Sequence, residues 1–408
     1  MEEKLLRAYA KTILVNGVAL QNGQKLILRA PVGAASFARL VAEEAYALGA
    51  ADIRTIWSDA VGERIRIDSA DEKALGRFHD WSLERSMEFA QDGACNLSII
   101  SPDNDVMQGA DTARMMLANR TGMRGMAPFN KLTSTNAIRW NVAAVPNENW
   151  AGQIFPDLKT DEAVERLWAD LLGCAYINDP EEAVADWQAH IAKVEAARNK
   201  LNTLPLVGMH FQNSLGTDLR VGLVDDPLFV GGTCATPDGI HFAPNIPTEE
   251  VFGVPHKDKA WGTMVSSMPL VYNGNILNHL ELTYEDGRLT KAHAEEGNDI
   301  LQSLIDSDEG ARHLGECAMA PSCTPIGSCG HLFYCTLFDE NAACHIAMGR
   351  GYGYGVGGED RSAEALAAKG LNDSMIHVDV MVGTPDMKVT GLLADGSETV
   401  LFDGDFVG

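Results

Sequence analysis

The sequence predicts an α/β protein with two domains: an N-terminal α/β domain with a mostly parallel sheet, and a C-terminal α+β domain. Its 408 residues exceed the usual length of one domain. The first half alternates short apolar runs with helical patterns, and the second half is rich in alternating, strand-like segments. We place the boundary at Pro205, which gives domains at residues 1–204 and 205–408.

The first elements predict parallel strands. Residues 25–30 (KLILRA) form a short apolar run, and apolar residues recur at helical spacing from Phe37 to Leu48, where Gly49 ends the pattern. Residues 52–57 (DIRTIW) predict a second strand. A strand, a helix and a strand within about 33 residues indicate a right-handed βαβ unit.

Predicted strands and helices continue to alternate up to residue 201, and predicted strands dominate after Pro205. Strands are expected at 96–100 and 138–145, with helices near 71–92 and 109–120 between the strands. Two further helices are expected at 161–172 and 179–201, the second with Asp179 as N-cap and Pro180 at its first position. Beyond Pro205, alternation predicts strands at 206–211, 219–223 and 387–393, the last followed by an Asp395-Gly396 turn.

The charge excludes one class of partner. Lys and Arg total 32 against 57 Asp and Glu, a formal net charge of −25, so a nucleic acid is not expected as a partner. Such a field favours metal ions and the ammonium group of a peptide or amine. The chain shows neither a secretory leader nor a long apolar run, so we expect a cytoplasmic protein without a membrane partner.

Two conspicuous patterns do not predict a cofactor site. The glycine run at 349–358 (GRGYGYGVGG) is followed by only about fifty residues, too few for a dinucleotide fold. We expect it instead to let the backbone bend past a site, with Tyr352 pointing inward. The five cysteines between 317 and 344 contain no CxxC pair, which favours buried thiols over a structural zinc site or an iron–sulfur cluster.

Carboxylates and histidines gather in the second half. His377 and Asp379 project to one face of a strand, either toward a site or as the polar edge of an amphipathic strand. The segment around Glu249 and Glu250 is expected to be extended, so only one of these side chains can face a shared site. Two adjacent carboxylates more often belong to a solvated surface, which is the alternative here. Other donors stand in apolar sequence, where burial is costly unless they are paired or bind a metal: Glu316, Asp339, Glu340, His345 and Tyr352.

Three windows, PNIPTEEVFGVP, TLFDENAACHIAMGRGY and HVD, occur in an order that resembles the aminopeptidase T and aminopeptidase S family of cytosolic metallo-aminopeptidases. The resemblance implies a homodimer whose C-terminal, metal-binding catalytic domain holds two divalent ions and acts on peptides with a free N-terminus. It also implies the following metal ligands: Glu250, Glu316, His345, Tyr352, His377 and Asp379.

Such a ligand set suits Zn, Co, Mn or Mg, without selecting one of them. Two ions would activate a bridging water, and we expect Glu316 to be the bridging carboxylate. Glu340 is the first candidate for the general base, with Glu249 the second, and Tyr352 can stabilise the oxyanion. Two alternatives stay open: a non-catalytic, metal-stabilised binding protein, and a nucleotide-dependent oxidoreductase that depends on the glycine run alone.

Overall fold

The computed structural model describes residues 1–103, 105–272 and 275–407, which form two compact units. The first unit comprises Met1–Ala189 and Thr233–Pro247. The second comprises His190–Gly232 and the chain from Thr248 onward. Because both units are discontinuous in sequence, a division into domains at Pro205 stays a prediction.

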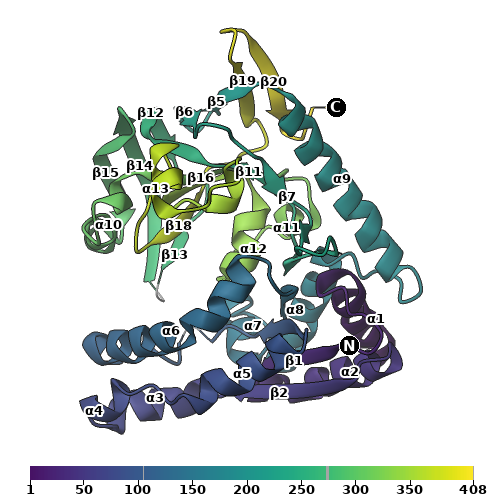
Figure 1. The fold of residues 1–408 in the computed structure, drawn as a ribbon. Coiled ribbons are helices and arrows are strands. Elements are labelled where there is room, and N and C mark those ends of the chain that lie inside the picture. The colour runs from purple at the N-terminus through teal and green to yellow at the C-terminus, as the bar shows by residue number, and fades with distance from the viewer. Residues whose placement is uncertain (104, 273–274, 408) are drawn as a thin grey trace. The chain divides into compact units, whose positions relative to one another are not determined.

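The first unit is a parallel sheet with helices. Its strands follow the order β10-β4-β3-β1-β2, and every neighbouring pair is parallel. The strands are β1 (Lys25–Pro31), β2 (Asp52–Ser58), β3 (Cys95–Ile100), β4 (Trp140–Ala144) and β10 (Asn245–Ile246), with a separate hairpin of β8 (Cys234–Ala235) and β9 (His241–Phe242). The helices are labelled in Figure 1: α1 (Glu3–Thr12), α2 (Ala35–Ala47), α3 (Ala60–Ser69), α4 (Glu72–Leu75), α5 (Trp81–Gln91), α6 (Thr112–Ser134), α7 (Glu148–Ile154), α8 (Thr160–Cys174) and the start of α9 (Ala183–Thr203). The predicted βαβ unit is confirmed as β1-α2-β2.

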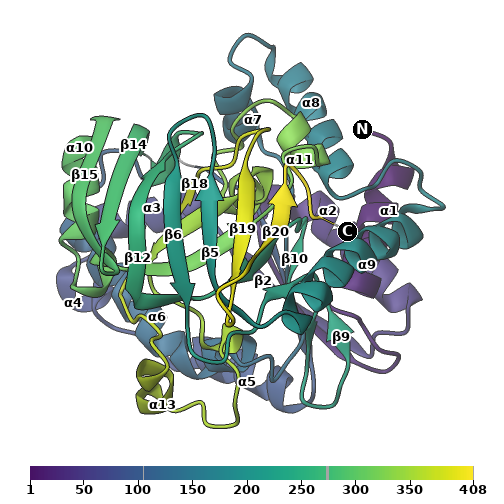
Figure 2. The same cartoon turned by 90° about the horizontal axis from the view of Figure 1, so that it is seen from above.

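The second unit contains two antiparallel sheets. Figure 2 shows β14, β12, β6, β5, β19 and β20 of the larger sheet side by side, in that order. Strand β13 precedes β14 in the order, and β15 also pairs with β14. These strands are β5 (Leu206–Gln212), β6 (Asp218–Leu223), β12 (Pro255–Val265), β13 (Leu270–Tyr272), β14 (Asn275–Glu285), β15 (Arg288–Glu296), β19 (Lys388–Leu393) and β20 (Glu398–Asp403). The predicted turn at Asp395-Gly396 joins β19 to β20, with Gly396 at φ +85°.

The smaller sheet carries the polar residues that the sequence singled out. Its order is β18-β17-β16-β11-β7, and all its pairs are antiparallel. The strands are β7 (Val230–Gly231), β11 (Val251–Gly253), β16 (Leu314–Met319), β17 (His345–Gly349) and β18 (His377–Met381). The short helices of this unit are α10 (Asn298–Ile305), α11 (Pro325–Ser328), α12 (Thr336–Asp339) and α13 (Ala363–Ala368), with 3₁₀ turns at Glu340–Ala342 and Gly353–Gly355.

Three expectations about helices need correction. Helix α9 begins at Ala183, not at Pro180: the Asp179 side chain accepts a hydrogen bond from the Glu181 amide, which closes a turn before the helix. The helix expected at 71–92 is two helices, α4 and α5, separated after Gly76. Helix α6 runs to Ser134, well beyond residue 120, because tertiary packing of Phe129 outweighs the cost of an internal proline at Pro128.

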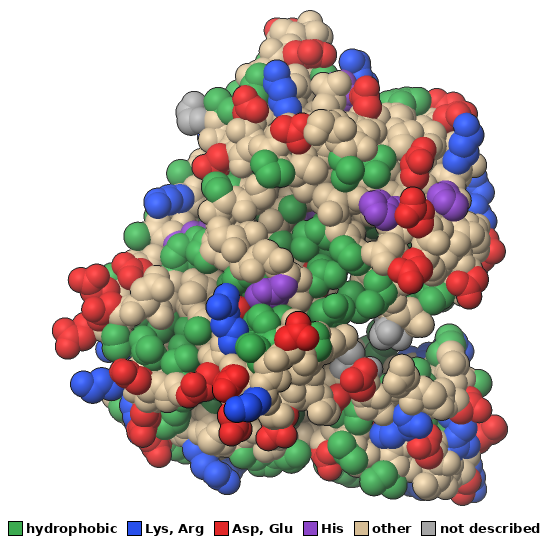
Figure 3. Space-filling model, turned by 180° about the vertical axis from the view of Figure 1, so that it is seen from behind, with side chains coloured by type: hydrophobic (Ala, Val, Ile, Leu, Met, Phe, Trp, Pro, Cys, Tyr) green, Lys and Arg blue, Asp and Glu red, His purple; other side chains and the backbone are tan. Residues whose placement is uncertain are grey.

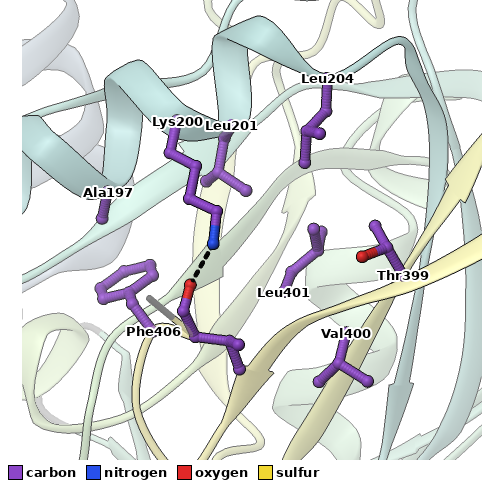
Figure 4. A pocket seen from close by; sticks show the side chains of 9 residues that line it. Ala197, Lys200, Leu201, Leu204, Thr399, Val400, Leu401 and Phe406 are labelled. Atoms are coloured by element: carbon purple, nitrogen blue, oxygen red, sulfur yellow. Dashed lines mark hydrogen bonds between the residues drawn. The ribbon is translucent and has the colours of Figure 1, made fainter.

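Phe406 and Val407 lie beside α9. Lys200 Nζ donates to the Val407 carbonyl (2.6 Å) at a small cavity of about 70 Å³, and Figure 4 shows the side chains that line this cavity. Leu201 and Leu401, on opposite walls, both belong to the main core of this unit. The C-terminal residues thus cover apolar surface between α9 and β20.

The acidic composition is visible on the face of the molecule that Figure 3 shows. Figure 3 shows acidic side chains scattered over the visible face instead of gathered in one patch.

All eight cysteines are free thiols, and Cys317, Cys335 and Cys344 are buried. Among the described residues, no helix combines the length and apolarity needed to cross a membrane.

Candidate metal centre

The smaller sheet of the second unit separates apolar from polar side chains. One face belongs to the main apolar core and includes Cys317, Ile346, Met348, Val378 and Val380. On the other face, strand register sets Ala347 of β17 opposite both Glu316 of β16 and Asp379 of β18. Directly paired residues project to the same face, so these strands bring their polar side chains together.

The first group comprises Glu250, Glu316 and His345. His345 Nε2 lies 3.0 Å from Glu250 Oε2 and 3.4 Å from Glu316 Oε1. The His345 and Glu316 side chains are only 1% and 5% exposed, and Glu250, directly before β11, is 12% exposed. Their donor atoms all lie within 4.8 Å of one another, which suits one shared cation.

The second group shares Glu316 and adds His377 and Asp379. His377 Nε2 lies 3.2 Å from Asp379 Oδ1 and 3.8 Å from Glu316 Oε2. The two carboxylate oxygens of Glu316 therefore face different groups, Oε1 toward His345 and Oε2 toward His377. Tyr352 lies against the second group, with its ring centroid 4.6 Å from that of His377.

The histidine tautomers leave Nε2 without a proton in the neutral form. His345 Nδ1 lies 3.3 Å from the Ala343 carbonyl, and His377 Nδ1 lies 2.7 Å from the Arg350 carbonyl. A carbonyl only accepts hydrogen bonds, so Nδ1 donates in both cases and Nε2 presents its lone pair to the carboxylates. A proton on Nε2 relieves this conflict in the metal-free site, and a metal cation between Nε2 and the carboxylate oxygens would relieve it as well. Such Nδ1 bonds commonly orient metal-binding histidines.

Two buried oxygens support the same interpretation. Glu250 Oε2 and Asp379 Oδ1 are inaccessible to solvent, and neither receives a hydrogen bond with proper geometry from the described residues. An unsatisfied buried carboxylate oxygen is costly unless it binds a cation. The residues present therefore fit divalent metal ions bound by oxygen and imidazole nitrogen.

The pKa values show how strongly these charges interact. Burial raises the pKa of Glu316 to about 7, against a lowering by the His345 hydrogen bond and with a further increase from Glu250. Burial opposes the charged form of His377, but the close carboxylate of Asp379 and its charge dominate and raise the His377 pKa to about 9. Without metal ions, protons therefore occupy this site near neutral pH.

The carboxyl group of Glu340, in the turn after α12, lies near these groups. Burial, followed by the charges of Glu250 and Asp379, holds its pKa well above the usual range. Its neighbour Asp339 instead accepts hydrogen bonds from the Phe333 and Cys335 amides (2.7 and 2.9 Å), so Asp339 fixes a loop and does not face the centre.

Glu249 and Glu250 diverge, as expected for an extended segment. Glu249 Oε2 lies 3.6 Å from His190 Nε2 on α9, whereas Glu250 faces His345. His190 Nε2 also lies 2.8 Å from the Thr248 carbonyl, and burial lowers the His190 pKa to about 4. Glu249 is thus engaged with α9 and is a poor candidate for a base at the centre.

Three further residues build the site and carried no signal in the sequence. Ala347 is fully buried between Glu316 and Asp379, where a larger side chain would fill the space between the carboxylates. Gly315 lies at a bulge, where a Cβ atom would come within 2.2 Å of the Arg350 carbonyl oxygen. Both positions are defined by strands distant in sequence, so no local pattern reveals them.

The third residue, Asn341, is fully buried and ties the Glu250 segment to the turn that carries Glu340. Asn341 Oδ1 accepts from the Glu249 amide (2.8 Å), and its Nδ2 donates to the Leu337 carbonyl (3.1 Å) and lies 3.4 Å from Glu340 Oε1. The bond to the Glu249 amide fixes the backbone directly before Glu250.

Comparison with known proteins covers nearly the whole chain. The model of the family described as thermophilic metalloprotease (M29) matches residues 2–406. The chain is 36% identical to Aminopeptidase 2 of Geobacillus stearothermophilus over 401 residues (98% of this chain, 97% of the relative). It is also 36% identical to Aminopeptidase T of Thermus aquaticus (97% and 96%) and 35% identical to Aminopeptidase PepS of Streptococcus thermophilus (98% of each).

Solved structures agree with these matches. Wild-type AmpT from Thermus thermophilus superimposes with a TM-score of 0.93 at 34% identity and covers all of both chains. A 2,5-dihydroxypyridine dioxygenase from Pseudomonas putida KT2440 superimposes with a TM-score of 0.57 at 13% identity (99% and 97% covered), which indicates a shared fold alone.

Proposed function

Because the chain belongs to the thermophilic metalloprotease (M29) family, we propose that it is a metallo-aminopeptidase that removes the N-terminal residue of peptides. The observation that carries the proposal is the position of Glu316, whose two carboxylate oxygens face two different groups of metal-binding side chains. Full-length relatives named as aminopeptidases supply the reaction class.

We assign the ligands to two metal positions that share Glu316. Glu250 and His345 complete the first position, and His377 and Asp379 complete the second, with Tyr352 as an additional oxygen ligand beside His377. Charge supports two ions: the three carboxylates carry three negative charges in a buried site, more than one divalent cation neutralises. Zn, Co, Mn and Mg all suit this donor set.

Bound divalent ions would polarise the scissile carbonyl, lower the pKa of a water molecule and accept the unprotonated N-terminal amine of the substrate. Three side chains of the protein have the remaining roles in the proposed reaction. Glu316 holds the two metal positions together. We assign Glu340 to take a proton from the attacking water and transfer it to the leaving amine, because its buried carboxyl group lies near Glu250 and Asp379. The Tyr352 phenol can donate a hydrogen bond to the developing oxyanion.

The resemblance also suggests a cytoplasmic homodimer. The acidic composition is consistent with substrates that carry a free ammonium group, since a net charge of −25 attracts cations. Sedimentation equilibrium on the metal-loaded chain tests the dimer: a monomer mass near 44.0 kDa at all concentrations would contradict it.

The decisive experiment compares peptides with free and N-acetylated termini. We expect hydrolysis of the free peptide only, loss of activity after treatment with EDTA, and recovery when a divalent ion is restored. Glu316→Gln should abolish turnover, whereas Glu398→Gln on the exposed edge of β20 serves as the matched control and should retain it. Equal hydrolysis of both peptides, or full activity after exhaustive metal removal, would refute the proposal. Metal binding without any hydrolysis would instead indicate a metal-stabilised binding protein.

A further inference from the structure

The first unit contains a cavity that the proposed peptidase reaction does not use. It has a volume of about 380 Å³, is open to solvent on one side, and lies between the sheet and α6. Asn96 and Ser98 of β3 and Arg29 of β1 line its sheet side, and Phe129 and Thr133 line its helical side. The volume is in the range of sites that bind small molecules.

Arg29 is the unusual feature of this cavity. Its Nε donates to Asn96 Oδ1 and its Nη2 donates to Ser86 Oγ, both at 3.0 Å and both to neutral acceptors. The guanidinium lies 4.9 Å from the centre of the Phe129 ring. Across the described chain, Arg29 forms no ion pair, and its Nη1 has no hydrogen-bond acceptor.

The surroundings of Arg29 do not supply a compensating charge. Burial, and then the nearby guanidinium of Arg85 on α5, lower the Arg29 pKa. Among the described residues, no aspartate or glutamate lines the cavity. A partly buried cation is normally paired, so an unpaired guanidinium held by two hydrogen bonds and an aromatic ring is a preformed anion-binding group.

The geometry points to a small organic carboxylate as the ligand, and we propose that the cavity binds such a molecule through Arg29. A single guanidinium matches one carboxylate in charge and planar shape, whereas a phosphate dianion would keep an uncompensated charge. Phe129, Met126 and Trp140 offer apolar contacts for the body of the ligand. Because no carboxylate lines the cavity, an ammonium group on the ligand would have no partner, which disfavours free amino acids. The proposal does not depend on the peptidase function.

The test uses 4-bromobenzoate with the full-length, metal-loaded protein. Titration calorimetry should detect binding to the wild type, and Arg29→Gln should weaken it roughly tenfold or more, because a charge-assisted hydrogen bond is lost. Arg29→Lys, which keeps the charge but not the planar fork, should weaken it less and remains informative if the glutamine variant folds poorly. Arg54→Gln is the matched control, since Arg54 is exposed on the neighbouring strand β2 and is paired with Asp52.

The position of the ligand can be observed directly. In crystals soaked with 4-bromobenzoate, we expect the anomalous signal of bromine in the cavity beside Phe129. Undiminished binding to both Arg29 variants, or a signal only at the proposed metal centre, would overturn the proposal. Tighter binding of inorganic phosphate than of 4-bromobenzoate would overturn the carboxylate assignment, as would equally tight binding of phenylalanine.

Discussion

Replacing Glu316 with glutamine should have opposite effects on the metal-loaded and metal-free protein. In the metal-free protein, burial raises the Glu316 pKa from 4.5 to about 7. A raised carboxyl pKa means that the folded state disfavours ionisation, so stability falls as the pH rises from 4.5 through 7. At ~1.4 kcal/mol per pKa unit, the ionised carboxylate destabilises the metal-free fold by about 3 kcal/mol above pH 7.

Glutamine has almost the same shape and no charge, so it removes this penalty. We expect metal-free Glu316→Gln to be more stable than the metal-free wild type at pH 8, by up to about 3 kcal/mol. The two protonated histidines also lose an anionic neighbour, which reduces the gain. Near pH 4.5 the difference should vanish. With metal ions the order reverses, because the variant loses the carboxylate shared by both positions.

The assay is chemical denaturation at pH 4.5 and pH 8, with EDTA and with the divalent ion that restores activity. Metal content by mass spectrometry should fall from two ions per chain to one or none in the variant. Glu398→Gln should change none of these values, since Glu398 is exposed on β20. If the metal-free variant were less stable than the metal-free wild type at pH 8, the electrostatic account of the site would be wrong.

Three further predictions concern the same centre. Metal affinity should increase from pH 6 to pH 9 with release of protons, because Glu316 and His377 hold protons with pKa values of about 7 and 9 in the metal-free site. Calorimetry in buffers of different ionisation enthalpy measures the number of protons released. A pH-independent metal affinity would contradict this prediction. Gly315→Ala should lower peptidase activity at least tenfold, because its Cβ displaces the carbonyl that orients His377; unchanged kinetics would show that the close approach is unimportant. Ala347→Val should reduce the metal content and lower the free energy of unfolding by about 1–3 kcal/mol through overpacking. Ile346→Val, on the opposite face of the sheet, should lower the free energy of unfolding by about 1 kcal/mol and retain the metal. Equal metal content in both variants would argue against a metal site at the Ala347 face.

The parallel sheet was predictable because its signals are local. Apolar runs of β1 and β2 flank a helical pattern that ends at Gly49, and these short-range features agree with the final fold. The start of α9 was not predictable from Asp179 and Pro180, because a turn and a helix begin with the same residue types. The hairpin of β14 and β15 was not predicted, although buried Leu280, Leu282 and Tyr284 alternate with polar residues. The Asp286-Gly287 turn that joins the two strands is a second local signal that went unused.

The sequence alone determined which donors were available: carboxylates and imidazoles in apolar surroundings, and the period of two that directs His377 and Asp379 to one face. Only the tertiary structure decided how the donors meet. The position of Glu316 between His345 and His377 depends on the register of β16, β17 and β18, and the space for metal ions depends on Ala347 opposite two carboxylates. Register between strands distant in sequence arises from packing of the whole sheet, so no local pattern of residues encodes it.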